Sequence, residues 1–275
     1  VEPYNVTQMV GRSGRLGIDP QGDAYILLPQ TTLEFHKNRL KVPQKIESQL
    51  LEKYGEHHKE LAFHLISEIH HGDICTNEDV HNWYKRSLAY FQSKELDETV
   101  IDKVMDLLQK CGAVRQDEEG NWVCTTVGKV ASLFYFSPFD VSDLKKNFTD
   151  LFTNKKDNDD IAVSMALGNI DTHRMNIVSK VEKDEMGMYS TKVQQSYTKY
   201  YNDASVKAGF CYHNLLNGFN GQAVAATQRN LMFDFNRVSQ VLQALDTMGM
   251  KWGKTQFFQN LEGRIRSGVP SHLVD

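Results

Sequence analysis

The chain has 275 residues, a formal net charge of −4 and four cysteines. Its length suggests roughly two domains, and its negative charge excludes a uniformly basic nucleic-acid-binding coat, so that any such contact must be local. The cysteines show no Cys-x-x-Cys spacing and are too few for a disulfide framework, which favours a reducing nuclear or cytoplasmic compartment. No apolar run reaches the length of a membrane span, and no signal peptide opens the sequence.

The first predicted elements are a short helix over residues 4–11 and a turn that carries two arginines. Arg12 and Arg15 lie three residues apart between glycines. A guanidinium group stays charged and offers a planar fork of donors, and Gly11 and Gly14 let the backbone turn tightly and approach a ligand. Arginines delivered in this way stabilise the charge on a transferring phosphoryl group. The turn therefore predicts contact with a polyphosphate, the alternative being a basic turn on a solvated surface.

The next elements predict the end of one domain and a complete second one. The apolar run at residues 23–28 predicts a buried strand of a parallel sheet, and residues 31–43 are expected to form a linker. Three helices and a hairpin follow, predicted at residues 57–71, 76–88, 100–111 and 113–124, with a capping box at Thr76 opening the second helix. This order is typical of a winged helix.

Winged helices often read nucleic acid, but the charges here favour another role. The third helix carries Glu98, Asp102 and Asp106, and the predicted hairpin turn at residues 117–121 is acidic. Acidic elements repel phosphate. We therefore interpret this unit as a brace between its neighbours, the alternative being DNA reading by the third helix.

The last strongly patterned element is a helix predicted over residues 235–248. Apolar residues occupy one face, and the other is polar but almost uncharged. Amides bond base edges and arginine pairs with phosphate, so this polar face matches a nucleotide strand, the alternative being an ordinary solvated face. The candidate strand contacts on the helix are Asn236, Arg237, Gln240, Gln243, Ala244 and Thr247, and the candidate phosphate contacts after it are Lys251, Lys254, Arg264 and Arg266.

Several of these segments resemble one protein family. The spacing Gln-x-x-Gly-Arg-x-Gly-Arg-x-Gly-x-Asp, from Gln8 to Asp19, resembles the last conserved motif of superfamily-two helicases of the superkiller-like DExH subgroup. Residues 125–138 and 261–269 are similar to the winged-helix end and the post-ratchet stretch of archaeal fork-repair helicases and of the polymerase theta helicase region. Asp234 and Arg237 reproduce the start of the family's ratchet helix, whereas Ala244 stands where family members can carry a stacking aromatic.

The resemblance implies a mostly α chain with four parts: the end of the second RecA-like α/β domain (1–30), a linker (31–45), a winged helix (46–136) and a helical ratchet domain (137–275). The implied activity is ATP-dependent translocation on a single strand with unwinding of the duplex, and DNA is favoured over RNA. Arg15 would be the transition-state finger, Arg12 a second phosphate contact and Gln8 an orienter of phosphate or water. Gly11, Gly14 and Asp19 would complete the nucleotide contact.

The ATP and Mg²⁺ implied by the resemblance would be held mainly by RecA-like domains missing from this sequence. No phosphate-binding loop ending in Gly-Lys-Ser/Thr and no DExH acidic motif occurs in it, so the chain alone is expected to be inactive. The alternative function is a non-catalytic helicase-like cassette that acts as a protein-interaction or RNA-remodelling scaffold.

Three other features of the sequence indicate no catalytic role. The histidines at positions 57, 58, 64, 70 and 71 lack a metal-ligand spacing and are expected to be surface or half-buried residues, so no metal site is predicted. The charged run at residues 155–160 is expected to be a solvated loop. Residues 157–219 receive no assigned role.

Overall fold

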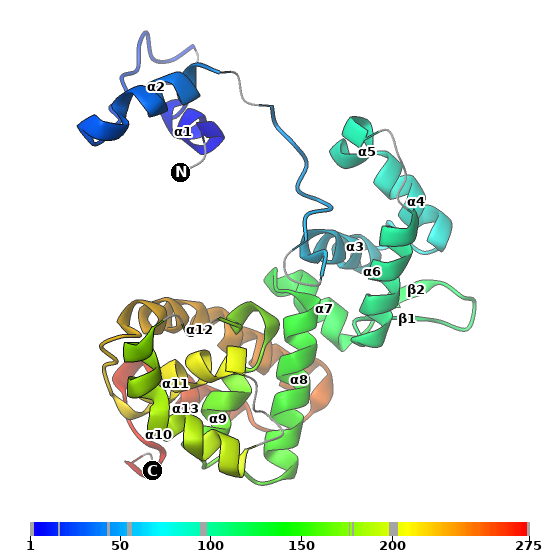
Figure 1. Cartoon of the computed structure of the whole chain (residues 1–275). Coiled ribbons are helices and arrows are strands. Elements are labelled where there is room, and N and C mark those ends of the chain that lie inside the picture. The colour runs from blue at the N-terminus through cyan, green and yellow to red at the C-terminus, as the bar shows by residue number, and fades with distance from the viewer. Residues whose placement is uncertain are drawn as a thin grey trace.

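The computed structural model describes residues 3–15, 17–42, 45–53, 57–93, 98–175, 177, 179–197 and 203–273. Within these ranges the chain is mostly helical and contains one two-stranded sheet. The elements fall into three groups in chain order (Figure 1). No described helix is long and apolar enough to cross a membrane.

The first group contains helices α1 (Pro3–Val10) and α2 (Leu33–Lys41) and is joined to the rest by an extended stretch at residues 45–53 (Figure 1). The predicted helix at residues 4–11 is confirmed as α1. The predicted linker at 31–43 instead contains a 3-10 turn, Gln30–Thr32, and α2.

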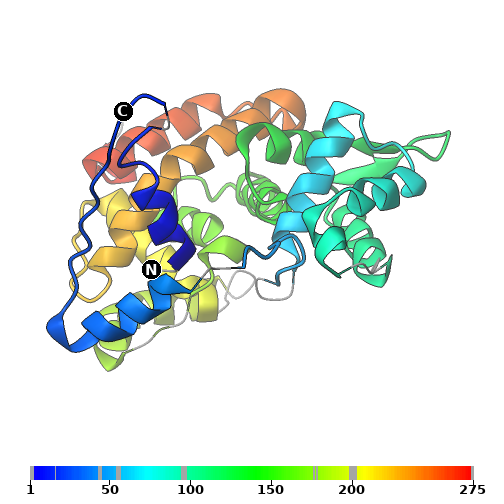
Figure 2. The same ribbon diagram turned by 90° about the horizontal axis from the view of Figure 1, so that it is seen from above.

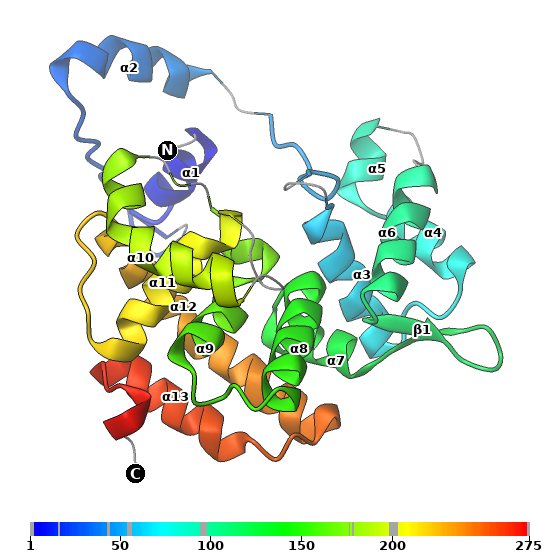
Figure 3. The same ribbon diagram turned by 60° about the horizontal axis from the view of Figure 1, so that its bottom comes forward.

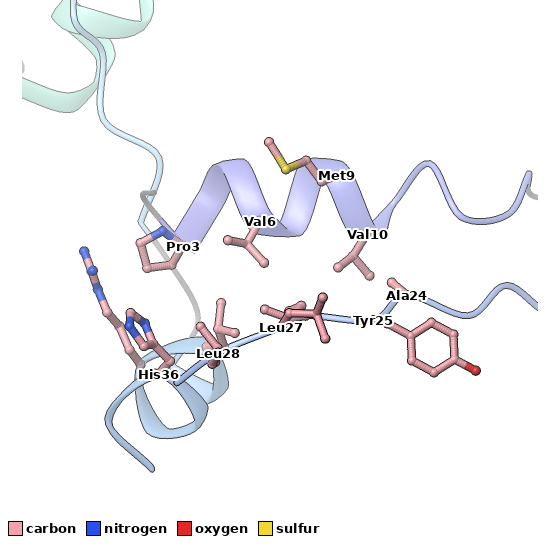
Figure 4. A pocket seen from close by; sticks show the side chains of 12 residues that line it. Pro3, Val6, Met9, Val10, Ala24, Tyr25, Leu27, Leu28 and His36 are labelled. Atoms are coloured by element: carbon pink, nitrogen blue, oxygen red, sulfur yellow. The ribbon is translucent and has the colours of Figure 1, made fainter. Parts of the chain in front are cut away.

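The strand predicted at residues 23–28 is wrong. This stretch is extended, but it pairs with no strand among the described residues, and Tyr25 and Leu27 are 88% and 95% exposed. A parallel strand needs a neighbour for its hydrogen-bond ladder, and the sheet found here lies elsewhere in the chain. Residues 24–28 instead line a cavity of about 580 Å³ together with α1 and α2. Val6 and Val10 lie on the side of α1 that faces this stretch (Figure 4).

The second group has the predicted order of helices and hairpin. Its elements are α3 (Lys59–His71), α4 (Asn77–Lys85), α5 (Leu88–Ser93), α6 (Glu98–Lys110), β1 (Val114–Gln116) and β2 (Trp122–Cys124). The strands are antiparallel, and Val114 pairs with Cys124. The predicted helix over residues 76–88 is confirmed as α4 but ends at Lys85, and Leu88 belongs to a further short helix, α5, that was not predicted.

Local sequence explains how α3 and α4 form. Leu61, Leu65 and Ile69 of α3 follow helical spacing and are buried, and each buried aliphatic side chain contributes about 1.5–3 kcal/mol. The predicted capping box opens α4: the Thr76 hydroxyl accepts from the Asp79 amide at 3.2 Å, and the Asp79 carboxylate accepts from the Thr76 amide at 2.8 Å. Two amide groups at the start of the helix are thereby satisfied.

The third group is a helical body. Helix α7 (Thr126–Phe134) leads into it, and its own helices are α8 (Pro138–Thr153), α9 (Asp160–Gly168), α10 (Lys180–Ser196), α11 (Asp203–Asn217), α12 (Ala225–Leu245) and α13 (Thr255–Ser267). A short π-helical turn, Asp246–Met250, follows α12. Seen from above, the second group lies beside this body (Figure 2).

Helix α9 lies at the centre of the body. All residues from Ala162 to Gly168 are buried, and α8 and α11 pack against the helix (Figure 3). A Cβ added at Gly168 would meet the Gly209 amide nitrogen at 2.5 Å, so α9 and α11 can approach this closely only because glycine stands there. The stretch to which the sequence assigned no role therefore supplies the middle of the core.

Helix α7 joins the second group to the body, because it packs against α3, α8 and α12. At its start the Thr125 hydroxyl accepts from the Val127 amide at 3.1 Å and donates to the Gly112 carbonyl at 2.5 Å. At its end Tyr135 adopts the left-handed conformation, with φ of 51°, and Ser137 caps α8. This turn coincides with the domain limit predicted at residue 136.

Candidate functional site

The arginine turn follows α1 directly and is fixed by backbone hydrogen bonds. The Gly11 amide donates to the Thr7 carbonyl at 2.9 Å, which ends the helix. The Asp19 carboxylate then accepts from the Arg15 amide at 2.8 Å, while the Asp19 amide donates to the Arg15 carbonyl at 3.0 Å. Asp19 therefore holds the loop in shape, and its carboxylate is occupied by the backbone.

A glycine that the sequence analysis did not single out closes this loop. A Cβ at Gly22 would meet the Ser13 carbonyl oxygen at 2.4 Å, whereas one at Gly14 would make ordinary contacts from 3.5 Å outward. Glycine is therefore required by close contact at position 22 and favoured by the left-handed φ of 79° at position 17, but not by contact at position 14. Gly22 lies shortly after the motif in the sequence, but its contact with Ser13 cannot be inferred from residue spacing.

The structure leaves the three predicted phosphate-contacting side chains accessible. Gln8, Arg12 and Arg15 are all exposed. None of the hydrogen bonds or ion pairs found among the described residues engages their side chains. Unpaired guanidinium groups on a fixed turn fit a polyphosphate, because they keep their donors available.

The predicted polar helix is α12, which starts earlier than expected, at Ala225, and ends at Leu245. Its apolar face is confirmed for Phe235, Val238 and Leu242, which are buried, whereas Met248 is 44% exposed and lies in the π-helical turn. On the opposite face the exposed residues are Asn236, Arg237, Gln240 and Thr247. Gln243 is half-buried and donates to the Ser239 hydroxyl at 3.1 Å.

Arg237 is exposed, but its guanidinium group is bound to the protein. Its Nη2 donates to the carbonyl oxygens of Phe134, at 3.3 Å, and Tyr135. The guanidinium also lies 5.5 Å from the centre of the Phe136 ring. Arg237 therefore links α12 to the end of α7, which the sequence analysis did not foresee.

Three predicted strand contacts are corrected by the structure. Ala244 is only 8% exposed and belongs to the core. Lys254 pairs with Asp157 at 2.7 Å, a contact that lowers the pKa of that carboxyl group by hydrogen bonding. The Arg264 side chain is 7% exposed and donates to Asp160 at 2.7 Å and to the Val269 carbonyl at 2.8 Å. Burial leaves Ala244 and Arg264 unavailable to a strand, whereas Lys254 is 35% exposed and already holds a carboxylate partner.

Residues 155–159 form the predicted loop, in which Lys155, Lys156 and Asn158 are exposed, but the same ion pairs give its carboxylates partners that the sequence did not indicate. Asp157 and Asp160 are the partners just described, and Asp159 caps α9 by accepting from the Ile161 amide at 3.1 Å. The cations come from α13 and the turn before it, far along the sequence, so no local pattern could reveal the pairs. Lys251 is exposed, and Arg266 is exposed but pairs with Glu262 at 2.6 Å.

The histidines of α3 and its start make structural contacts. The His57 ring stacks on Phe139 with centroids 4.5 Å apart, and His70 Nδ1 lies 3.0 Å from the Ser132 hydroxyl. Burial lowers the pKa of His70, with smaller contributions from His71 and Lys129. Among the residues that the structure describes, no group of three or more His, Cys, Asp or Glu side chains could hold a metal ion.

Comparison with known proteins places these elements in context. No family model matches the chain. The chain is 28% identical over 176 residues to an activating signal cointegrator 1 complex subunit 3-like protein of Dictyostelium discoideum, covering 55% of the chain and 8% of the relative. It is 21% identical over 280 residues to the DExH-box ATP-dependent RNA helicase DExH13 of Arabidopsis thaliana, covering 94% of the chain and 12% of that protein. The chain is similar to DExH helicases.

A third relative extends the similarity to DNA enzymes. The ATP-dependent DNA helicase Hel308 of Thermoplasma acidophilum is 29% identical over 136 residues, covering 48% of the chain and 19% of that protein. The relatives thus include helicases named for RNA and for DNA, and the similarity supports a superfamily-two helicase region. The chain spans between 8% and 19% of the length of these three relatives.

Proposed function

We propose that this chain is the C-terminal region of an ATP-dependent nucleic-acid helicase of the superkiller-like class, of the kind represented by archaeal fork-repair helicases and the polymerase theta helicase region. The observation that carries the proposal is the arginine turn: Arg12 and Arg15 are exposed and unpaired on a loop that Asp19 and Gly22 hold in shape. The similarity to an RNA helicase over 94% of the chain supports it.

In this proposal the turn reaches the γ-phosphate of ATP. Arg15 is the principal finger on the charge that develops during phosphoryl transfer. Arg12 is a second phosphate contact and Gln8 orients phosphate or water, while Gly11, Gly14 and Asp19 shape the turn. ATP and Mg²⁺ are held mainly by the RecA-like domains that precede this region, which are its first partners.

The surface proposed to bind the strand contains fewer residues than the sequence predicted. Asn236 and Gln240 of α12, together with Thr247 and Lys251 after it, form the exposed polar surface offered to a single strand. Arg266 and the half-buried Gln243 contribute less to this surface, since both already have protein partners. The second group, a proposed winged helix, acts as the brace between the arginine turn and the ratchet helix.

DNA is the favoured strand. The four free cysteines support a nuclear or cytoplasmic location.

A strand-displacement assay on the full-length protein tests this function. DNA and RNA duplexes with either overhang should show ATP-dependent unwinding, with DNA unwound faster. The 275-residue chain alone should show no ATPase activity above background. Robust turnover by the chain alone, or no unwinding of any duplex by the full-length protein, would contradict the proposal.

A second candidate is a non-catalytic cassette that serves as an interaction scaffold. It is favoured by relatives whose names describe assemblies, namely a complex subunit and a pre-mRNA-splicing factor. A full-length protein that binds nucleic acid but lacks phosphate-binding and DExH motifs upstream would support this function instead.

A further inference from the structure

The junction of α7 and α12 presents exposed aromatic rings. Tyr135 is 75% exposed and Phe233 is 73% exposed. Phe233 precedes Arg237 by one helical turn, so the two side chains lie on the same face of α12. Arg237 in turn donates to the Tyr135 carbonyl. Arg237 therefore joins the backbone at Tyr135 to the face of α12 that carries Phe233, although the two residues lie about a hundred positions apart in the chain.

Other aromatic residues support this junction from beneath. The Phe63 ring of α3 lies 5.8 Å from the Tyr135 ring, with their planes 35° apart. The Phe136 ring lies 5.5 Å from the Arg237 guanidinium group. Phe63 and Phe136 are both half-buried, so the exposed rings rest on a partly fixed aromatic layer.

The backbone at Tyr135 is also unusual. Its φ of 51° and ψ of 47° are left-handed, a conformation that glycine adopts freely and a bulky residue adopts at a cost. A glycine would end α7 without strain, and the tyrosine ring contributes little to the core because most of it is exposed. A costly residue whose side chain faces solvent is a sign of function.

The stretch of α12 around Phe233 has a small positive balance. The exposed residues Arg229 and Arg237 outnumber the one exposed carboxylate on the same stretch of α12, Asp234. The amides of Asn236 and Gln240 are exposed next to them. Flat apolar groups, amides and a positive balance fit a single nucleic-acid strand, since aromatic rings stack on any base.

We propose that Tyr135 and Phe233 form a platform that stacks on bases of a single strand, and that Arg237 is a positioning residue that holds Tyr135 in place. This inference rests on the proposed function. The two rings would provide the base stacking that position 244 cannot provide, because it holds a buried alanine.

The test measures strand affinity of the 275-residue chain by fluorescence anisotropy, using an oligonucleotide and an abasic strand of equal length. Tyr135→Asn removes the ring while keeping a residue that tolerates the left-handed conformation. Both Tyr135→Asn and Phe233→Ala should weaken binding of the base-bearing strand by about 5- to 150-fold and leave the abasic strand nearly unaffected. Phe91→Ala is the matched control, because Phe91 on α5 is also 73% exposed; it should change neither affinity.

Tyr135→Phe should retain wild-type affinity, because the ring remains. Arg237→Ala should produce the same loss as Tyr135→Asn, and the double variant should lose no more than either alone, as expected if Arg237 acts through the ring. Additive losses that extend to the abasic strand would instead make Arg237 a phosphate contact and overturn its positioning role.

The remaining outcomes separate this inference from the proposed function. Wild-type binding that survives both ring variants overturns the platform alone. Equal losses on both strands show that the rings only support the fold, and also overturn it. Ring variants that abolish self-association of the chain, measured by sedimentation, but spare strand binding make the rings a protein contact. A wild-type chain that binds no strand contradicts both proposals.

Discussion

The arginine-bearing segment at residues 3–42 and the helical body at 138–273 differ in how much of their surface is buried. Pro3 is the only fully buried residue among those described in the first segment, and Leu27 is 95% exposed. In the body, α9 is buried along nearly its whole length. The first segment shows how much structure local hydrogen bonds can fix, and the body shows what only packing between distant helices can fix.

The difference is clearest in what each region needs from the rest of the chain. The hydrogen bonds between Asp19 and Arg15 and the packing of Gly22 on Ser13 join residues at most nine positions apart. The apolar stretch at 23–28 needs neighbouring strands, and none lies beside it among the described residues. The segment therefore holds a turn fixed by local hydrogen bonds next to an extended stretch that pairs with no described strand.

The largest effect is expected at the turn. In the full-length protein, Arg15→Ala should lower the ATP hydrolysis rate by roughly a thousandfold and change ATP affinity far less, because an arginine finger acts mainly on transition-state charge. Single-turnover hydrolysis and equilibrium nucleotide binding measure the two effects. Arg86→Ala, at an exposed arginine outside the turn, is the control. Normal turnover in Arg15→Ala would place the finger elsewhere.

Within the body, losing the ion pair between Arg264 and Asp160 should have a larger effect than losing the pair between Arg266 and Glu262. Arg264→Ala leaves the Asp160 carboxylate, which is 14% exposed, without its partner, and removing one member of a buried pair costs about 3–5 kcal/mol of unfolding free energy. Arg266→Ala breaks a pair whose arginine is 66% exposed and should cost less than about 1 kcal/mol. Urea unfolding of both variants measures the difference. A stable Arg264→Ala variant with weakened strand binding would instead favour the strand contact predicted from sequence.

A pair of leucines compares the two regions directly. Leu242→Ala opens a cavity at a fully buried position of α12 and should cost about 2–5 kcal/mol. Leu27→Ala, in the exposed stretch, should change stability by less than about 0.5 kcal/mol. If both variants unfold at the same lowered denaturant concentration, residues 23–28 are part of a core after all.

The smallest effect concerns a carboxyl group of α8. Burial, together with Asp140, raises the pKa of Asp143 from 3.8 to about 6. The folded state then holds this proton more tightly than the unfolded state, so stability falls as pH rises through about 6. Asp143→Asn should therefore raise Tm above that of the wild type at higher pH, by about 2–4 °C for each kcal/mol gained, with the gap closing below pH 3.8.

The matched control for Asp143 comes from the first segment. Asp23 is exposed in the stretch that lacks a core, so Asp23→Asn should leave the pH dependence of Tm unchanged. Calorimetry across this pH range decides the point. A gap for Asp143→Asn that does not vary with pH would mean that the carboxyl group is not responsible.

The sequence by itself determined the elements whose bonds are local. The helix of residues 3–10, the capping box at Thr76, the hairpin and the apolar face of α12 all follow from spacing and neighbouring side chains. The arginine motif also came from sequence, and the structure adds that Asp19 and Gly22 shape it.

Only the tertiary structure decided which charged and aromatic side chains remain available. Arg264 and Lys254 look identical to free cations in sequence, yet each is held by a carboxylate about a hundred positions away. Tyr135 looks like an ordinary helix-end aromatic until Arg237 of a distant helix binds its carbonyl. Burial and pairing depend on which helices meet, and local periodicity does not contain that information.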